Sequence, residues 1–158
     1  MTSVEKQVTA IIKTFERPDR LLKLVESIRC FYPDLRVVIV DDSREKLEHD
    51  FDDKITYIHT EHDIGASKGR NIAVSHVKTP FTLLLDDDFL FTKKTQLEKL
   101  LEIIECDIDI VSGSYIDYGH TVRICHGVFE KDGDTLFLRL GKPQTDSSKI
   151  PLYDMVLQ

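Results

Sequence analysis

The stretch LLLDDDFLF, residues 83–91, places three consecutive aspartates inside an otherwise apolar segment. The leucines before Asp86 are typical of a buried strand, whereas ionised carboxylates are almost never buried without a partner. Like charges at contact distance also repel each other. We therefore expect a strand that ends at an open edge of the molecule, where a group other than a protein side chain neutralises the aspartates.

Apolar segments alternate with helical patterns on both sides of this stretch. The expected strands are residues 8–15, 35–40, 55–60, 81–85 and 109–116, and the expected helices are residues 17–32, 65–77 and 95–105. Apolar strands separated by helices predict an α/β fold with a mostly parallel, Rossmann-like sheet covered by helices on both faces. Segments 121–130 and 135–140, joined around Asp132 and Gly133, predict a late antiparallel hairpin.

The composition limits the class of protein. A chain of 158 residues is expected to form one domain, residues 1–158, and no apolar run is long enough for a membrane span. The formal net charge of −7 argues against a nucleic-acid partner. Cys30, Cys106 and Cys125 form no metal-ligand pattern, and we expect buried structural thiols in a cytoplasmic protein.

Polar residues gather where the expected strands end. Ligands of open α/β sheets bind beyond the carboxyl ends of the strands. The residues at these ends are Lys13, Thr14, Phe15 and Arg17, then Asp41, Asp42 and Ser43, then Asp63, Gly65, Lys68 and Arg70, and finally Asp86, Asp87 and Asp88. The basic residues of this set and the start of the helix after Gly65 can bind a phosphate group. The sequence therefore predicts a ligand that carries phosphate.

The three aspartates also predict a metal site. Because side chains alternate along a strand, Asp86 and Asp88 are expected on one side and Asp87 on the other. Two carboxylates on one side provide the oxygen ligands that Mg²⁺ or Mn²⁺ prefers, and these ions take further ligands from substrate phosphates. We expect the cation to supply the neutralising charge.

Four motifs in this order resemble a known family: VTAIIKTFERPDRL, VVIVDDS, DIGASKGRN and LLLDDDF. The sequence resembles the nucleotide-sugar-binding half of GT-A-fold glycosyltransferases of the family 2 type. With FYPDL before VVIVDDS, it is most similar to the β-1,4-N-acetylgalactosaminyltransferases of the ganglioside-synthase group. The resemblance implies a GT-A fold with a donor-binding core at residues 7–116. It also implies that residues 117–158 hold the hairpin and the start of an incomplete acceptor side.

The resemblance implies a role for each motif. Thr14 and Phe15 would lie along the uridine, and the Asp41/Asp42 pair would supply a carboxylate that binds the uracil ring. Arg70 would hold the nucleotide, with Asn71 supporting the loop, and Asp86 with Asp88 would form the DxD pair that holds Mn²⁺ or Mg²⁺, with Asp88 as the more direct ligand. By their position at the strand ends, Arg17, Lys68 and Asp87 are expected to complete the nucleotide site. The implied reaction transfers a sugar, with inversion, from UDP-GalNAc or a similar donor to a hydroxyl of a glycan or glycolipid.

The sequence leaves the catalytic residue unassigned. Family members continue into an acceptor-binding segment that supplies the general base, whereas this chain stops at PLYDMVLQ. Asp154 is a candidate base, and His120 and His126 are candidate metal ligands, each with a surface or core role as the alternative.

Other interpretations stay open. The chain can be a UDP-sugar-binding module or fragment without full activity, a receiver-type signalling domain with a phospho-accepting aspartate, or a sugar nucleotidyltransferase. A Golgi-lumenal domain excised from a membrane-anchored protein is the alternative to a cytoplasmic location.

Overall fold

The computed structural model describes residues 4–106, 109–115, 127–133, 135–140 and 156–157. The chain divides into two compact units, Met1–Lys93 and Lys94–Gln158. The single domain expected from the sequence stays a prediction. No helix in the described part of the chain is long and apolar enough to cross a membrane.

A four-stranded parallel sheet forms the centre of the first unit. Its strands are β1 (Val8–Thr14), β2 (Arg36–Asp41), β3 (Ile55–His59) and β4 (Phe81–Asp86). The order across the sheet is β3-β2-β1-β4, and each neighbouring pair is parallel. All four strands overlap the predicted segments closely. The prediction of an α/β fold with a mostly parallel sheet is therefore confirmed.

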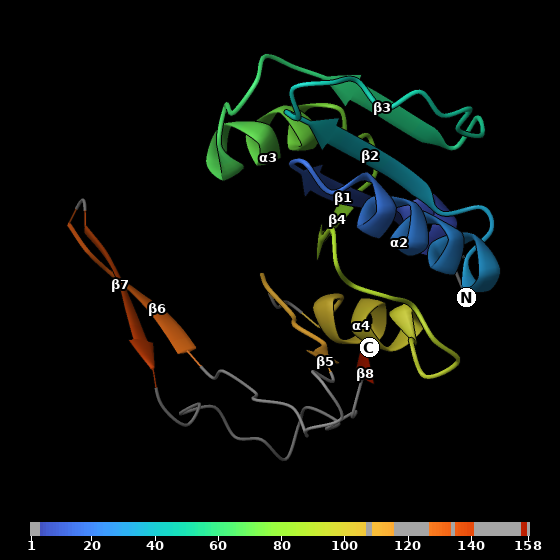
Figure 1. Cartoon of the computed structure of the whole chain (residues 1–158). Helices are drawn as coiled ribbons and strands as arrows, with labels where there is room; N and C mark the ends of the chain where they lie inside the picture. Colours follow the sequence, from blue (N-terminus) through green and yellow to red (C-terminus); the bar gives the residue numbers. More distant parts are fainter. Residues whose placement is uncertain (1–3, 107–108, 116–126, 134, 141–155, 158) are drawn as a thin grey trace. The chain divides into compact units, whose positions relative to one another are not determined.

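Three helices accompany this sheet: α1 (Val4–Gln7), α2 (Pro18–Phe31) and α3 (Ala66–Ser75). Proline fits the first turn of α2 because its fixed φ suits a helix and no N–H partner is needed there. Leu21, Leu24 and Ile28 of α2 are fully buried. Helix α2 connects β1 to β2, and α3 connects β3 to β4 on the other side of β1. Because such crossovers are right-handed, the two helices cover opposite faces of the sheet (Figure 1).

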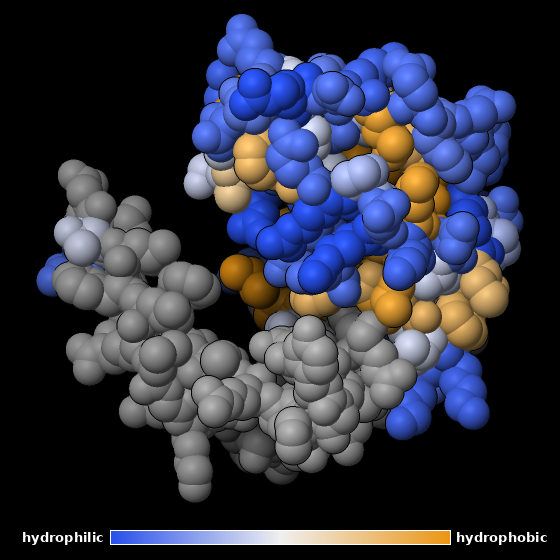
Figure 2. Space-filling view, viewed as in Figure 1, coloured by the Kyte–Doolittle hydropathy of each residue, from blue (hydrophilic) through white to orange (hydrophobic). Residues whose placement is uncertain are grey.

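The hydrophobic core follows the alternation of side chains along the strands. Ile11, Val38, Val40 and Ala73 form a buried cluster on the face that α3 covers. The alternate residues of β1 and β2 point to the other face, where Ile12 and Ile39 are neighbours in register and fully buried. Outside this core, the space-filling view shows a mostly hydrophilic surface with small apolar areas (Figure 2).

The order of the strands determines where a ligand can bind. The chain runs outward from β1 to β2 and β3, and then returns to place β4 on the opposite side of β1. The direction of winding therefore reverses between β1 and β4. In open α/β sheets, the crevice at such a reversal, beyond the carboxyl ends of the strands, is the usual ligand site.

The second unit contains the later elements. They are α4 (Leu97–Ile104), β5 (Ser114–Tyr115), β6 (Gly127–Asp132), β7 (Thr135–Leu140) and β8 (Val156–Leu157). Strands β6 and β7 pair antiparallel around Gly133, and β5 pairs parallel with β8. Residues 121–126 of the expected hairpin lie outside the described residues.

Two expectations from the sequence need correction. The strand expected over residues 109–116 is only the two-residue β5 among the described residues, because the segment before it carries Asp109, Ser112 and Gly113, which have low strand propensity. Cys30 and Cys106 are exposed rather than buried. Cys125 lies outside the described residues.

Candidate functional site

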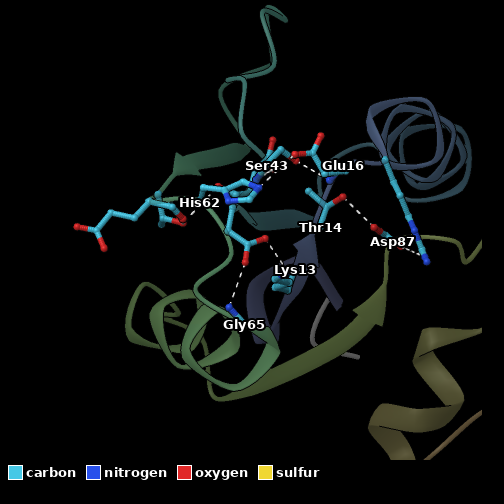
Figure 3. A network of polar contacts seen from close by, with 12 residues as sticks. Lys13, Thr14, Glu16, Ser43, His62, Gly65 and Asp87 are labelled. Atoms are coloured by element: carbon cyan, nitrogen blue, oxygen red, sulfur yellow. Dashed lines mark hydrogen bonds and ion pairs between the residues drawn. The ribbon is translucent and has the colours of Figure 1, made fainter.

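The carboxyl ends of the four parallel strands carry a connected set of polar contacts. Figure 3 shows residues from the end of β1, from the loop after β2 and from the segments beyond β3 and β4 at one edge of the sheet. This is the edge at which the winding of the sheet reverses. Within the first unit, the structure therefore brings together the strand ends that the sequence singled out.

Asp87 links β4 to β1 across the reversal point. The Thr14 hydroxyl donates a hydrogen bond of 2.8 Å to Asp87 Oδ2, and Arg17 Nη1 lies 3.3 Å from Asp87 Oδ1 (Figure 3). Thr14 and Asp87 are both buried, whereas the Arg17 side chain is about half exposed. The carboxylate is thus held by one neutral donor below it and one cation toward solvent.

The three aspartates diverge instead of alternating. Asp86 Oδ1 accepts a hydrogen bond of 2.9 Å from Arg70 of α3, whereas Asp88 Oδ2 lies 3.3 Å from Arg20 Nη1 of α2. Strand β4 ends at Asp86, and the Phe89 N–H closes a turn onto the Asp86 carbonyl. The extended alternation therefore stops, and the prediction that Asp86 and Asp88 share one side, opposite Asp87, is wrong.

Arginines neutralise the three aspartates in this structure. Arg70 pairs with Asp86, Arg17 pairs with Asp87 and Asp88, and Arg20 also pairs with Asp88. The expectation that no side chain could supply the neutralising charge is therefore wrong. The arginine side chains are 43–58% exposed, and ion pairs this exposed are worth about 0–1 kcal/mol each. A competing ligand can displace them at little cost.

Asp42 is a buried structural anchor. Its side chain is fully buried, Lys13 Nζ lies 2.6 Å from Oδ1, and the Gly65 N–H donates to Oδ2 at 3.2 Å. The contact with Lys13 is an ion pair rather than a well-aligned hydrogen bond. Lys13 is thus committed to Asp42, and its predicted part in binding phosphate is not supported by its position. Asp42 itself ties the start of α3 to the end of β2.

Two glycines make this anchor possible. Gly65 precedes α3 with φ 84° and ψ 163°, a region of backbone conformation that essentially only glycine occupies. Gly69 lies in α3 so close to Lys13 that an added Cβ would be 2.7 Å from the Lys13 Cγ. The Lys13 side chain therefore crosses the helix at Gly69 to reach Asp42. This explains both glycines of the GASKG segment in physical terms.

Asp41 is held by a different set of donors. The Tyr57 hydroxyl donates to Asp41 Oδ2 at 2.7 Å, and the Ser43 N–H donates to Oδ1 at 2.9 Å. The Tyr57 oxygen also accepts the Leu47 N–H at 3.1 Å. Burial, and then the hydrogen bond to Asp41, raise the pKa of Tyr57 well above its ordinary value. Asp41 is buried, so this network orients its carboxylate rigidly.

The loop after β1 is held by contacts that the sequence did not indicate. The Glu16 N–H donates to Ser43 Oγ at 2.7 Å, and the Glu16 carboxylate accepts the Arg44 N–H at 2.9 Å (Figure 3). Glu16 has φ 55°, an uncommon value for a residue other than glycine. His62 Nε2 lies 3.6 Å from Glu16 Oε1. These contacts join the β1 loop to the loops after β2 and β3.

Phe15 presents an aromatic surface beside this loop. Its ring centroid lies 5.4 Å from that of His62, and the Lys13 ammonium lies 5.0 Å from its ring centre. Lys68 is exposed on the first turn of α3 and lies outside the network described above, whereas the other predicted site residues take part in it. The candidates Asp154, His120 and His126 lie outside the described residues.

The donor set has the chemistry that a hard divalent cation requires. Asp86 and Asp88 present carboxylate oxygens with side chains 56% and 41% exposed. Among the described residues, no three His, Cys, Asp or Glu side chains group closely enough to hold a metal ion by themselves. A cation here would therefore take most of its ligands from water and from a phosphate-bearing ligand, as Mg²⁺ commonly does.

The fold and the site define an α/β protein in which polar residues gather at the carboxyl edge of a parallel, Rossmann-like sheet. The family model described as "Glycosyl transferase family 2" matches residues 9–148. The chain therefore belongs to glycosyl transferase family 2, as the resemblance of the four motifs implied. Membership in this family favours the glycosyltransferase interpretation over a receiver domain or a nucleotidyltransferase.

Curated relatives extend this result. The chain is 39% identical to Beta-1,4 N-acetylgalactosaminyltransferase 2 of Mus musculus over 142 residues, which cover 89% of this chain and 28% of that protein. It is 43% identical to Beta-1,4 N-acetylgalactosaminyltransferase 1 of Rattus norvegicus over 113 residues, which cover 71% of this chain and 21% of that protein. The chain thus spans about a quarter of the length of these relatives.

Solved structures share the fold. The structure of S. aureus TarS 1–349 matches with a TM-score of 0.57 and 20% identity, covering 79% of this chain and 41% of that chain. A second structure of S. aureus TarS matches with a TM-score of 0.51 and 21% identity, covering 70% of this chain and 21% of that chain. At this level of identity the likeness establishes the glycosyltransferase fold alone.

Proposed function

We propose that this chain forms the donor-binding part of a glycosyltransferase. The donor is a UDP-sugar, UDP-GalNAc or a close analogue, bound with Mn²⁺ or Mg²⁺, and the sugar passes with inversion to a hydroxyl of a glycan or glycolipid. The observation that carries the proposal is the contact of Asp87 with Thr14 and Arg17 at the reversal point of the sheet, in a chain of this family. The names of the N-acetylgalactosaminyltransferase relatives support the choice of sugar.

The carboxyl ends of the four parallel strands and the loops that follow them form a rim. The groups at this rim suit the parts of such a donor. The Phe15 ring offers an apolar surface for a nucleobase. The Asp41 carboxylate is buried, and Ser43 and Tyr57 hold it in place. Arg17 and Arg70 are cations whose exposed ion pairs a diphosphate can displace. Asp42 is fully buried and bound to Lys13, so we assign it a structural role beneath the nucleotide rather than contact with the base.

A divalent cation would be held by Asp88 or Asp86, together with waters and the diphosphate. When bound, it supplies positive charge that stabilises the departing diphosphate. The protein's own contribution is to hold Asp87 and Asp41 in fixed positions through Thr14 and Tyr57, so that the rim is organised before the donor arrives. The predicted cytoplasmic location and its Golgi-lumenal alternative stay predictions.

Thermal denaturation of the full chain with UDP, GDP, CDP or ADP, each with Mn²⁺ or with EDTA, tests this proposal. We expect UDP with Mn²⁺ to stabilise the protein most, by about 2.7 kcal/mol when UDP reaches a hundred times its dissociation constant. Asp88→Asn should lose the Mn²⁺-dependent part of the shift, because it removes a carboxylate that would hold the cation. The fold should stay intact, because the Asp88 side chain is 41% exposed. Equal shifts with all four nucleotides, or none with UDP, would overturn the proposal.

A further inference from the structure

We propose that Arg20, which pairs with Asp88, is an anion-binding residue of the donor site, and that it turns to a diphosphate when a divalent cation takes its place on Asp88, so that the cation and the diphosphate bind cooperatively. This inference rests on the proposed function and deepens it, because it assigns a role to a residue that is absent from the four sets of strand-end residues named in the sequence analysis. Arg20 thus competes with a cation for the Asp88 carboxylate. In the loaded state Arg20 turns to the diphosphate.

The position of Arg20 is the first observation behind this proposal. Arg20 lies one helical turn after Arg17 at the start of α2, and its N–H donates to the Arg17 carbonyl at 3.1 Å. Residues three apart lie on the same face of a helix. Accordingly, Nη1 of Arg20 and Nη1 of Arg17 approach the same oxygen, Asp88 Oδ2, at 3.3 and 3.7 Å. Among the described residues, Arg20 forms an ion pair with Asp88 alone.

The shared oxygen makes this arrangement easy to rearrange. Two guanidinium groups that approach one carboxylate oxygen repel each other, and Arg17 keeps its second partner, Asp87, when Arg20 leaves. The Arg20 and Asp88 side chains are 58% and 41% exposed, so solvent screens their attraction. The Lys13–Asp42 pair differs because it is buried beneath the rim and cannot exchange in this way.

The balance of charges gives the expected cooperativity. Arg17 and Arg20 offset Asp87 and Asp88, so the cluster of these four side chains is neutral by itself. A divalent cation bound alone leaves the cluster with excess positive charge, and a dianionic diphosphate bound alone leaves excess negative charge. Both together restore neutrality. Each ligand should therefore strengthen the binding of the other.

Arg20→Gln separates this role from a structural one because it moves two affinities in opposite directions. Without Arg20, Mn²⁺ alone meets a freer and more negative Asp88 and should bind about two- to fivefold more tightly, the range expected for an exposed ion pair. UDP in the presence of saturating Mn²⁺ loses one cation and should bind more weakly, by about fivefold or more. Arg20→Lys should keep most of the UDP affinity.

The experiment uses the full chain and two probes, Mn²⁺ alone measured by the electron paramagnetic resonance of free Mn²⁺, and UDP with Mn²⁺ measured by calorimetry. Arg36→Gln is the matched control, because Arg36 is an exposed arginine at the start of β2, the opposite end of the sheet. Arg36→Gln should change the affinities for Mn²⁺ and for UDP only by the small amount that the loss of one distant positive charge causes. Thermal denaturation of each variant checks that it is folded.

The outcomes distinguish this inference from the proposed function. If the wild type binds no UDP, the proposed function fails and this inference fails with it. If the wild type binds UDP with Mn²⁺ but Arg20→Gln matches Arg36→Gln in both affinities, only this inference is overturned. This inference alone is also overturned if Arg20→Gln weakens the binding of Mn²⁺ and of UDP together. It is likewise overturned if neither Arg20→Gln nor Arg36→Gln binds Mn²⁺ measurably in the absence of UDP.

Discussion

Replacing Lys13 by methionine should show how strongly the buried ion pair supports the site. The substitution keeps a long unbranched side chain that can still pass Gly69, but it removes the cation that lies 2.6 Å from Asp42 Oδ1. The Asp42 side chain is fully buried and that of Lys13 is 13% exposed, so the carboxylate would remain buried without a compensating charge. Breaking one side of a buried pair costs about 3–5 kcal/mol. We expect about 3 kcal/mol here, at the lower end, because Lys13 is partly exposed.

Urea denaturation of the full chain measures this cost. A second variant, Lys13→Met with Asp42→Asn, removes the stranded charge while the amide oxygen still accepts the Gly65 N–H. We expect it to recover about 1–2 kcal/mol relative to Lys13→Met alone, the approximate cost of desolvating an unpaired group. Arg36→Met is the surface control. A loss below about 0.5 kcal/mol for Lys13→Met, comparable to an ordinary surface change, would refute the assignment of Asp42 as a buried anchor.

Three further predictions concern the surroundings of the site. Gly69→Ala should destabilise the protein by about 1–2 kcal/mol in urea, because overpacking against Lys13 outweighs the gain in helix propensity, and stabilisation instead would show that Lys13 moves aside freely. Tyr57→Phe should cost about 1–3 kcal/mol at pH 7, because Asp41 and the Leu47 N–H each lose a buried partner. Because the pKa of Tyr57 is raised above its ordinary value of 10.0, the stabilisation that the Tyr57 hydroxyl provides is complete below pH 10.0 and is lost as the pH rises further. The stability of Tyr57→Phe should therefore fall less steeply in alkali than that of the wild type. Arg29→Gln should remove the hydrogen bond that, as the main cause, lowers the pKa of Asp52 below its ordinary value of 3.8. That contribution is present above pH 3.8 and lost at lower pH. This contribution to stability should stay below about 1 kcal/mol because the Asp52 side chain is 42% exposed. If acid lowers the stability of Arg29→Gln and of the wild type equally, this prediction is contradicted.

The strands and helices of the first unit were predictable because their signals are local. Continuous apolar runs such as VVIV (residues 37–40) and the alternation of strands with helices leave few other folds for residues 8–86. The gathering of polar residues at one edge followed from the same pattern, since parallel strands end on the same side. A strand was predicted over residues 109–116, but its reduction to the two residues of β5 was not predictable, because short apolar segments with glycine and serine carry an ambiguous signal.

The pairing of charges was not predictable from the sequence. Whether Lys13 faces Asp42 or a ligand depends on which strands are neighbours, and β1 and β2 adjoin only in the folded sheet. The alternation expected for Asp86 and Asp88 failed because the chain turns directly after β4. Tyr57 lies outside the four motifs, and the first motif assigns no role to its Glu16, because the contacts of both residues depend on loops that meet in three dimensions.

We propose that UDP and a divalent cation bind at the rim formed by the carboxyl ends of β1 and β4. Amide spectra of the isotope-labelled full chain, recorded with UDP and substoichiometric Mn²⁺, test it directly, because paramagnetic broadening falls steeply with distance from the ion. We predict that broadening centres on Asp86, Asp87 and Asp88 and reaches Arg17 and Arg20, while Leu35 and Arg36 at the opposite end of the sheet stay sharp. Broadening centred elsewhere, or unchanged by the addition of UDP, would contradict the claim.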